Sequence, residues 1–306
     1  MFANPKNMFM SSALAFYTSL ALLPAGARAQ TPVERPFAAA SQAPDLNFPK
    51  APSPLPAVPR MGLFKPNGVG PFPALVLHHQ CGGLSRGEWQ NKSMLEWARQ
   101  AVNRGYVVLL LDSLSERGVD TVCMGPKNGV NFARGVRDAL LGAEHLRKFG
   151  FIDGKRIAHV GFSWGAMVSL LANSRWYQSA LNVGAGFSAH VSFYPGCFAV
   201  TPASGPSFEI VRPDIRRKHL VLMGDKDNEA PAPQCVAKLS DAKAKGSPVE
   251  WHVYPNTTHC WDCENLNGYS KTDIRGNHVV YRYDAKITVD SAKRSFEFLD
   301  RTWRGN

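Results

Sequence analysis

The sequence predicts an α/β fold with a doubly wound, mostly parallel sheet. Short apolar runs without polar alternation recur along the chain, as in parallel strands that are buried on both faces. Helical patterns lie between these runs, so strands and helices alternate as βαβα. The chain has 306 residues and 44% hydrophobic content, which is enough for one large domain with a full core.

Each element is justified by its own residue pattern. Residues 106–112 contain a run of valine and leucine residues without alternation, which favours a buried strand. Residues 88–104 carry apolar side chains at helical spacing and end at Gly105. On these criteria we predict strands at 72–78, 106–112, 156–160, 191–194, 220–224 and 250–255, and helices at 88–104, 131–149, 166–172, 238–245 and 285–303.

The first 60 residues are predicted to lie outside this domain. An apolar run at 12–23 precedes a small-x-small cleavage pattern at 27–29, so residues 1–29 are predicted to be a secretory signal peptide. We therefore expect an exported protein, periplasmic or secreted, without stable membrane insertion once this segment is cleaved. Residues 30–60 are rich in Pro and Ala and are predicted to be a linker, which leaves 61–306 as the folded domain.

The stretch Gly161–Gly165, with the sequence GFSWG, lies between a predicted strand and a predicted helix. A turn this sharp forces its central residue into a strained conformation and exposes the Ser163 hydroxyl above the sheet. This arrangement is the nucleophile elbow of an α/β-hydrolase fold, which requires a serine, then an acid, then a histidine along the chain. Asp225 and Asp227 follow the strand at 220–224, and His259 follows the strand at 250–255.

The loop after the first strong strand is the predicted source of an oxyanion-hole donor. One donor in this fold is the backbone N–H after the nucleophile, here Trp164, and the other comes from the early loop, here Gln80 or Cys81. A metal site at His78 and His79 is an alternative, but nothing acidic stands near them in the sequence to complete it.

Six cysteines in an exported domain favour disulfides. Fifteen pairings are possible. We favour pairs on neighbouring loops that follow strands, with a C-x-x-C pair closing on itself behind His259. Metal binding by His259 with the C-x-x-C cysteines is the alternative. The favoured pairs are Cys81–Cys123, Cys197–Cys235 and Cys260–Cys263.

The formal net charge is +11, with basic residues scattered along the chain. No nucleic-acid recognition motif is present, so we expect no nucleic-acid partner for an exported protein. The positive surplus favours acidic substrates or an anionic envelope surface instead.

Five blocks of the sequence resemble the dienelactone hydrolase family, in that family's order and over roughly residues 71–301. They are His78–Leu84, Asp112–Leu114 with Arg117-Gly118, Gly161–Gly165, Gly224–Pro231 and Tyr254–His259.

The resemblance implies specific site residues. It places the acid three residues after Gly224, which selects Asp227 over Asp225. It implies that Arg117 holds a substrate carboxylate, whereas a surface or salt-bridge role is the alternative. The family's namesake enzymes have cysteine where Ser163 stands and glutamate where Gln80 stands, so serine esterase chemistry is expected here.

We therefore predict a serine hydrolase that cleaves small-molecule carboxylic esters or lactones through an acyl-enzyme, with Ser163 as nucleophile, His259 as base and Asp227 as its partner. No cofactor or metal is expected. An acyltransferase or a peptidase with the same triad remains an alternative, as does a binding protein that has lost catalysis.

Overall fold

The computed structural model describes Met1, residues 44–202 and residues 207–304. Apart from Met1, the predicted signal peptide lies outside the described residues, as does the predicted linker up to residue 43. The described residues from 44 onward belong to one compact unit. Within these two ranges, no helix combines the length and apolar character of a membrane span.

A seven-stranded sheet forms the centre of this unit in the described part of the chain, in the order β1-β5-β2-β6-β7-β10-β11. All neighbours pair in parallel except β1 and β5, which pair antiparallel. Its inner strands are mostly apolar where they are buried, because both faces of the sheet are covered. The strands are β1 (Gly62–Phe64), β2 (Phe72–His78), β5 (Val107–Leu111), β6 (Ile152–Phe162), β7 (Ala189–Phe193), β10 (His219–Gly224) and β11 (Val249–Tyr254).

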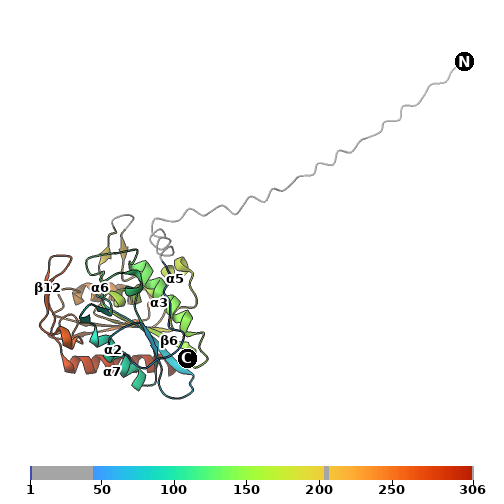
Figure 1. Ribbon diagram of the computed structural model, residues 1–306. Coiled ribbons are helices and arrows are strands. Elements are labelled where there is room, and N and C mark those ends of the chain that lie inside the picture. Colours follow the sequence, from blue (N-terminus) through green and yellow to red (C-terminus); the bar gives the residue numbers. More distant parts are fainter. Residues whose placement is uncertain (2–43, 203–206, 305–306) are drawn as a thin grey trace. The chain divides into compact units, whose positions relative to one another are not determined.

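Helices cover both faces of the sheet, which confirms the predicted α/β fold (Figure 1). One face packs against α3, α4, α5 and α6, and the other packs against α2 and α7. The helices are α2 (Lys92–Asn103), α3 (Phe132–Leu146), α4 (Trp164–Ala172), α5 (Arg175–Leu181), α6 (Ala232–Ala244) and α7 (Ala285–Arg304), with short 3₁₀ turns η1 (Ser115–Arg117) and η2 (Glu264–Leu266).

In the part of the chain that the structure describes, three antiparallel pairs of short strands lie outside the main sheet. One of them changes a predicted boundary: the helix expected from residue 88 begins at Lys92, because residues 85–86 and 89–90 pair around Gly87 at φ +54°. The pairs are β3 (Ser85–Arg86) with β4 (Trp89–Gln90), β8 (Ala199–Val200) with β9 (Phe208–Glu209), and β12 (Ser270–Thr272) with β13 (His278–Val280).

The packed chain begins before the predicted domain start at residue 61. Asp45 pairs with Arg134 at 2.6 Å and with Arg137 at 3.0 Å, both on α3. Phe48 stacks on His145 of the same helix, with ring centroids 5.1 Å apart. The C-terminal part of the predicted linker is therefore held against α3 by an ion-pair cluster and a stacked ring.

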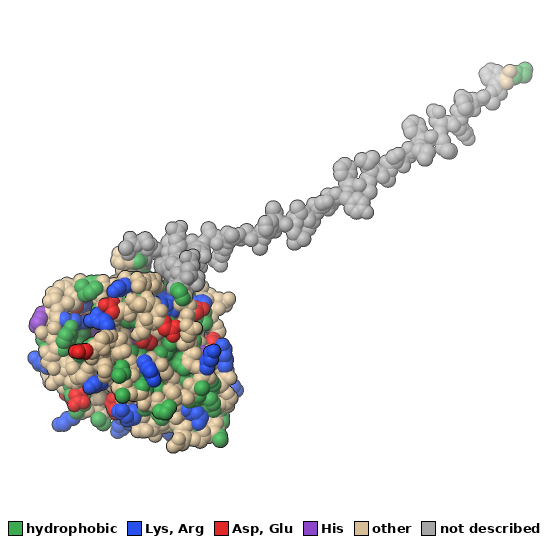
Figure 2. Space-filling model, viewed as in Figure 1, with side chains coloured by type: hydrophobic (Ala, Val, Ile, Leu, Met, Phe, Trp, Pro, Cys, Tyr) green, Lys and Arg blue, Asp and Glu red, His purple; other side chains and the backbone are tan. Residues whose placement is uncertain are grey.

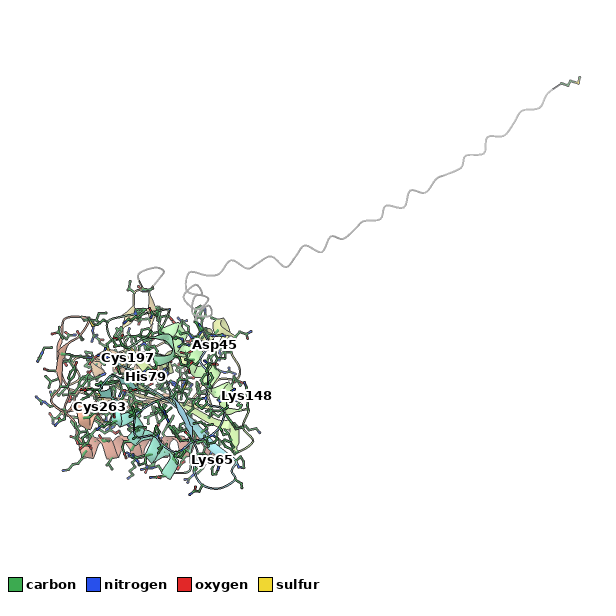
Figure 3. The ribbon with its side chains drawn as sticks, viewed as in Figure 1. Asp45, Lys65, His79, Lys148, Cys197 and Cys263 are labelled. Atoms are coloured by element: carbon green, nitrogen blue, oxygen red, sulfur yellow. A yellow bond between two sulfur atoms is a disulfide. The ribbon has the colours of Figure 1, made fainter. Side chains whose placement is uncertain are left out.

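All six cysteines lie in the described residues and form three disulfides, with the pairing favoured from the sequence: Cys81–Cys123, Cys197–Cys235 and Cys260–Cys263. Figure 3 labels one cysteine from each of the last two pairs. The first disulfide joins the loops after β2 and β5, and the second joins the loop after β7 to α6, which follows β10. Because β2 neighbours β5 and β7 neighbours β10, parallel pairing brings these loops to the same sheet edge.

Candidate active site

Ser163 occupies the turn between β6 and α4 with φ +49° and ψ −109°. Such a backbone conformation is strained for a residue with a side chain and persists only where the surroundings impose it. The flanking glycines are required by close approach. A Cβ atom at Gly161 would overlap the carbonyl of Gly165, and one at Gly165 would overlap the carbonyl of His78.

The structure brings Ser163, His259 and Asp227 together from three loops that follow strands β6, β11 and β10. Nε2 of His259 lies 3.0 Å from Oγ of Ser163, and Nδ1 lies 2.7 Å from Oδ2 of Asp227. All three side chains are buried. A hydroxyl hydrogen-bonded to an imidazole, which is in turn hydrogen-bonded to a carboxylate, is the arrangement that activates a serine nucleophile.

The local turn explains why Asp227, and not Asp225, faces His259. The backbone N–H groups of Glu229 and Ala230 donate to Oδ1 of Asp227 at 3.0 and 2.8 Å, which leaves Oδ2 for the imidazole. Asp225 is exposed and its carboxylate instead accepts the backbone N–H of Thr257 at 3.3 Å.

A second carboxylate, which the sequence reasoning missed, lies on the other side of the imidazole. Oε2 of Glu229 is 3.9 Å from Nε2 of His259. Burial lowers the pKa of His259, but the negative charges of Asp227 and Glu229 outweigh burial and leave that pKa raised. The two carboxylates therefore favour the charged form of the imidazole.

The hairpin of β12 and β13 is tied to Glu229. Nζ of Lys271 donates to Oε1 at 2.7 Å, the hydroxyl of Tyr281 donates to Oε2 at 2.8 Å, and a guanidinium N–H of Arg275 donates to the Glu229 carbonyl. Burial raises the pKa of Glu229, but the nearby positive charges and donors outweigh burial and keep it lowered. In the sequence, Glu229 is marked only by its position two residues after Asp227. That position does not predict contacts with a distant hairpin.

Behind the imidazole lies a buried polar network. The hydroxyl of Tyr194 donates to Asp262 at 2.7 Å, and the indole N–H of Trp97 donates to the other oxygen of Asp262 at 2.7 Å. The Tyr194 ring packs against His259 with centroids 4.6 Å apart. Gln80 donates to the Tyr194 hydroxyl at 3.1 Å, so its side chain is engaged in this network.

The predicted oxyanion donors lie around Ser163. Trp164 is the first residue of α4, where backbone N–H groups have no acceptor within the helix. The N–H of Gly165 donates to the carbonyl of His79 at 3.1 Å, which holds the loop after β2 against this helix terminus. Of the two loop candidates, Cys81 lines the cavity at Ser163, and Gln80 is absent from the described lining residues.

Arg117 does not line that cavity. Its guanidinium is nearly buried and donates to both oxygens of Asp138 at 2.7 and 2.8 Å, and to the carbonyl of Pro44. These contacts correspond to the salt-bridge alternative and not to a hold on a substrate carboxylate. Asp138 lies on α3, so the pairing ties the loop after β5 to that helix.

A cavity of about 540 Å³ opens at Ser163 and His259, within the size range of small-molecule sites. Its described lining is mainly apolar and comes from the loop after β5, the start of α3, α4 and the β8–β9 and β12–β13 pairs. The apolar members include Val122, Met124, Phe132, Trp164, Met167, Phe198, Val200, Phe208 and Ile274, and the charged members are Glu229, Lys271, Asp273 and Arg275.

A metal site requires several ligand atoms that lie close to one another. Among the described residues, Cys260, Asp262 and Cys263 are the group whose ligand atoms lie close enough. Their sulfurs form a disulfide, whereas metal binding requires thiolates, so this group does not fit a metal ion. The alternative metal site at His78 and His79 does not fit either, because the nitrogens of the two rings face different partners. The His78 ring faces Ser113 Oγ and His159. The His79 ring faces the Gln80 carbonyl and the Ser113 N–H.

A row of histidines lies buried beneath this site. His159, His190 and His219 are cross-strand partners on β6, β7 and β10, and His78 Nδ1 lies 3.2 Å from His159 Nε2. Burial lowers the pKa of each of them, to about 3 for His159 and His219, so they are neutral in the folded protein. His79, which Figure 3 labels inside the domain, is buried with a lowered pKa as well.

Comparison with known proteins gives one family and several solved structures that share the fold. A family model described as the dienelactone hydrolase family matches residues 60–302. Curated proteins yield no match. A dienelactone hydrolase-like promiscuous phosphotriesterase from metagenomic libraries superposes with a TM-score of 0.54 at 19% identity, covering 76% of this chain and 87% of that chain.

Two further solved structures give a similar result. An alpha/beta hydrolase enzyme from a Medee basin deep-sea metagenome library has a TM-score of 0.54 at 18% identity, over 76% of this chain and 84% of that chain. Esterase 2 of Thermogutta terrifontis, phosphorylated by paraoxon, has a TM-score of 0.55 at 14% identity, over 78% of this chain and 87% of that chain. At these identities the structures support the fold.

Proposed function

The chain belongs to the dienelactone hydrolase family, and from this premise we propose that it is a serine hydrolase that cleaves carboxylic esters or lactones of small molecules. The observation that carries the proposal is the unbroken hydrogen-bonded chain from Ser163 Oγ through His259 to Asp227, at 3.0 and 2.7 Å, in which Ser163 and His259 line a mainly apolar cavity. The family model and the esterase-like neighbours support the same reaction class.

In the first half of the reaction, Nε2 of His259 takes the proton from Ser163 while Oγ attacks the ester carbonyl carbon. Asp227 holds the Nδ1–H of the ring and stabilises the imidazolium that forms. When the tetrahedral intermediate collapses, the C–O bond to the alcohol breaks and the alcohol leaves with the proton from His259. The product of this half is an acyl-Ser163.

Two backbone N–H groups are proposed to hold the oxyanion: that of Trp164 and that of Cys81 or Gln80. We favour Cys81, because it lines the cavity and its disulfide to Cys123 fixes the loop. Each such donor contributes roughly 3–4 kcal/mol to transition-state stabilisation in comparable sites.

In the second half, His259 removes a proton from water, which attacks the acyl carbonyl. Collapse breaks the bond to Oγ, returns the proton to Ser163 and releases the carboxylic acid. In a lactone the alcohol and acid remain one molecule. This chain has a serine at the elbow and a glutamine at position 80, so charge tuning of a thiolate plays no part in the proposed cycle.

We also propose that residues 1–29 are a signal peptide, that the folded domain follows them and that the mature protein is periplasmic or secreted. The three disulfides support this proposal, because disulfides persist in oxidising compartments.

The test is ester turnover by Ser163→Ala compared with wild type. We expect kcat to fall at least about 10⁴-fold with the fold retained, since the nucleophile is lost and the buried packing is not. Folding is checked by circular dichroism. Retention of wild-type turnover in the folded variant would overturn the assignment of Ser163.

A further inference from the structure

We propose that the cavity selects uncharged esters that carry an aromatic or similarly bulky apolar group, and discriminates against anionic ones. This inference deepens the proposed ester hydrolysis and rests on it. It runs against the expectation of acidic substrates that follows from net charge alone, because the local chemistry of a binding cavity decides which substrate it accepts.

An aromatic wall lies beside Ser163. The Phe132 ring stacks on Trp164 with centroids 6.0 Å apart and meets Phe208 edge-on at 6.4 Å. Phe198 lines the same cavity. Rings arranged in offset and edge-on geometry offer faces and edges to a further aromatic group, which such surfaces bind better than a short alkyl chain.

The cavity also has an apolar rim. Met124 is 68% exposed and Ile274 is 59% exposed, and both line the cavity although they come from different loops. The first lies next to Cys123, whose disulfide fixes that loop, and the second lies at the turn between β12 and β13. An exposed apolar group on each of two cavity-lining loops gives an apolar substrate a surface to contact as it enters.

The Lys and Arg side chains of the cavity lining are already paired with carboxylates of the protein. Among the described lining residues, Lys271 and Arg275 are the Lys and Arg side chains, and the imidazole of His259 is paired with Asp227 at 2.7 Å. Lys271 pairs with Glu229 at 2.7 Å and Arg275 pairs with Asp273 at 3.1 Å. The pKa of each carboxylate is lowered by its partners in spite of burial, so both pairs stay charged and compensated.

An anionic substrate therefore meets no uncompensated Lys or Arg among the lining residues that the structure describes. It would lose its hydration on entering and would lie near two ionised carboxylates. Arg117, whose family counterpart is expected to hold a substrate carboxylate, is committed to Asp138 outside the cavity. The charge of +11 is a property of the whole chain, and Figure 2 shows Lys and Arg spread over the visible face with Asp and Glu among them.

The first experiment compares matched substrates on the mature wild-type protein. 4-Nitrophenyl methyl adipate and 4-nitrophenyl hydrogen adipate differ only in a methyl cap on a carboxylate. We expect kcat/KM to be at least about 100-fold higher for the capped ester, since burying an unpaired charge is costly. 4-Nitrophenyl benzoate and acetate, each normalised to its hydroxide-catalysed rate, should differ at least about tenfold in favour of the benzoate.

The second experiment uses variants that change one feature each. Phe132→Ala should lower the benzoate-to-acetate ratio at least about fivefold, and Phe198→Ala serves if the first does not fold. Phe151→Ala is the matched control, because it is a partly buried phenylalanine outside the described cavity lining. The control should leave the ratio at the wild-type value.

Glu229→Gln should unmask Lys271 and raise the ratio of anionic to neutral adipate turnover at least about tenfold. The ratio is the readout because Glu229 also lies beside His259 and absolute rates will change. Asp241→Asn is the charge-matched control, since Asp241 pairs with Lys245 on the exposed surface of α6.

The outcomes separate the two proposals. Ester turnover with equal kcat/KM for capped and anionic adipate, or for benzoate and acetate, overturns the inference and leaves the hydrolase in place. Ratios that stay at the wild-type value in the folded Phe132→Ala or Phe198→Ala variant, or in the folded Glu229→Gln variant, overturn the inference as well. Absence of turnover on every ester, together with absence of a fluorophosphonate adduct on Ser163, overturns the proposed function and the inference with it.

Discussion

Acidification should destabilise this protein through its row of buried histidines. The ordinary histidine pKa is 6.5, and burial lowers it to about 3 for His159 and His219. Between these two pKa values, His159 and His219 are protonated in the unfolded chain and neutral in the folded chain. The contribution of these neutral histidines to the free energy of unfolding is fully present above pH 6.5 and is lost as the pH falls from there toward about 3.

The magnitude follows from the two values. Between about pH 7.5 and about pH 5, each of these two histidines removes about 2 kcal/mol from the free energy of unfolding, because the unfolded form is protonated and the folded form is not. Together they remove about 4 kcal/mol, a large part of the stability of a typical domain. His78, His79 and His190, whose pKa values burial also lowers, act in the same direction.

The perturbation is His159→Gln, which removes one titrating group and keeps an amide that can face His78. Urea unfolding, followed by circular dichroism across this pH range, gives the free energy of unfolding at each pH. The variant should lose about 2 kcal/mol less than wild type between the two pH values, whatever its stability at neutral pH. His278→Gln, which replaces an exposed histidine, is the control. Equal pH-dependent losses in wild type and His159→Gln would refute the reasoning.

Two further predictions concern the site and its frame. Glu229→Gln removes a negative charge that raises the pKa of His259. Because the base must be neutral to act, the acidic limb of the profile of kcat/KM against pH should move to lower pH. An unmoved limb contradicts the electrostatic role of Glu229. Replacing Cys81 and Cys123 by serine opens a disulfide with a sequence separation of 42, and the free energy of unfolding should fall by about 4 kcal/mol in urea titrations; an unchanged unfolding midpoint contradicts this.

Much of the fold was predictable because its signals are local. Continuous apolar runs identify the inner strands, and the residues of β2 and β5 match the prediction closely. The elbow at Ser163 was predictable for the same reason, since strand, turn and helix are adjacent in sequence. The start of α2 was predicted too early, because the β3–β4 hairpin around Gly87 carries Trp89 at a position that also fits an apolar position of a helix.

The rest depends on contacts between distant segments. Arg117 meets Asp138 only because the loop after β5 packs against α3, and the sequence shows an isolated basic residue. Glu229 acquires its neighbours from a hairpin more than 40 residues away, through Lys271 and Tyr281. Such pairings follow from tertiary packing, which periodicity along the chain does not encode.

The central claim is that Ser163 is an activated nucleophile, and intact mass after reaction with a fluorophosphonate tests it most directly. The account predicts one adduct on the mature wild-type protein, mapped to Ser163 by peptide analysis. It also predicts that this adduct is absent in Ser163→Ala and is strongly diminished in a folded His259→Ala variant, because the base is lost. An unmodified wild-type protein, an adduct on another residue, or equal labelling of His259→Ala would contradict it.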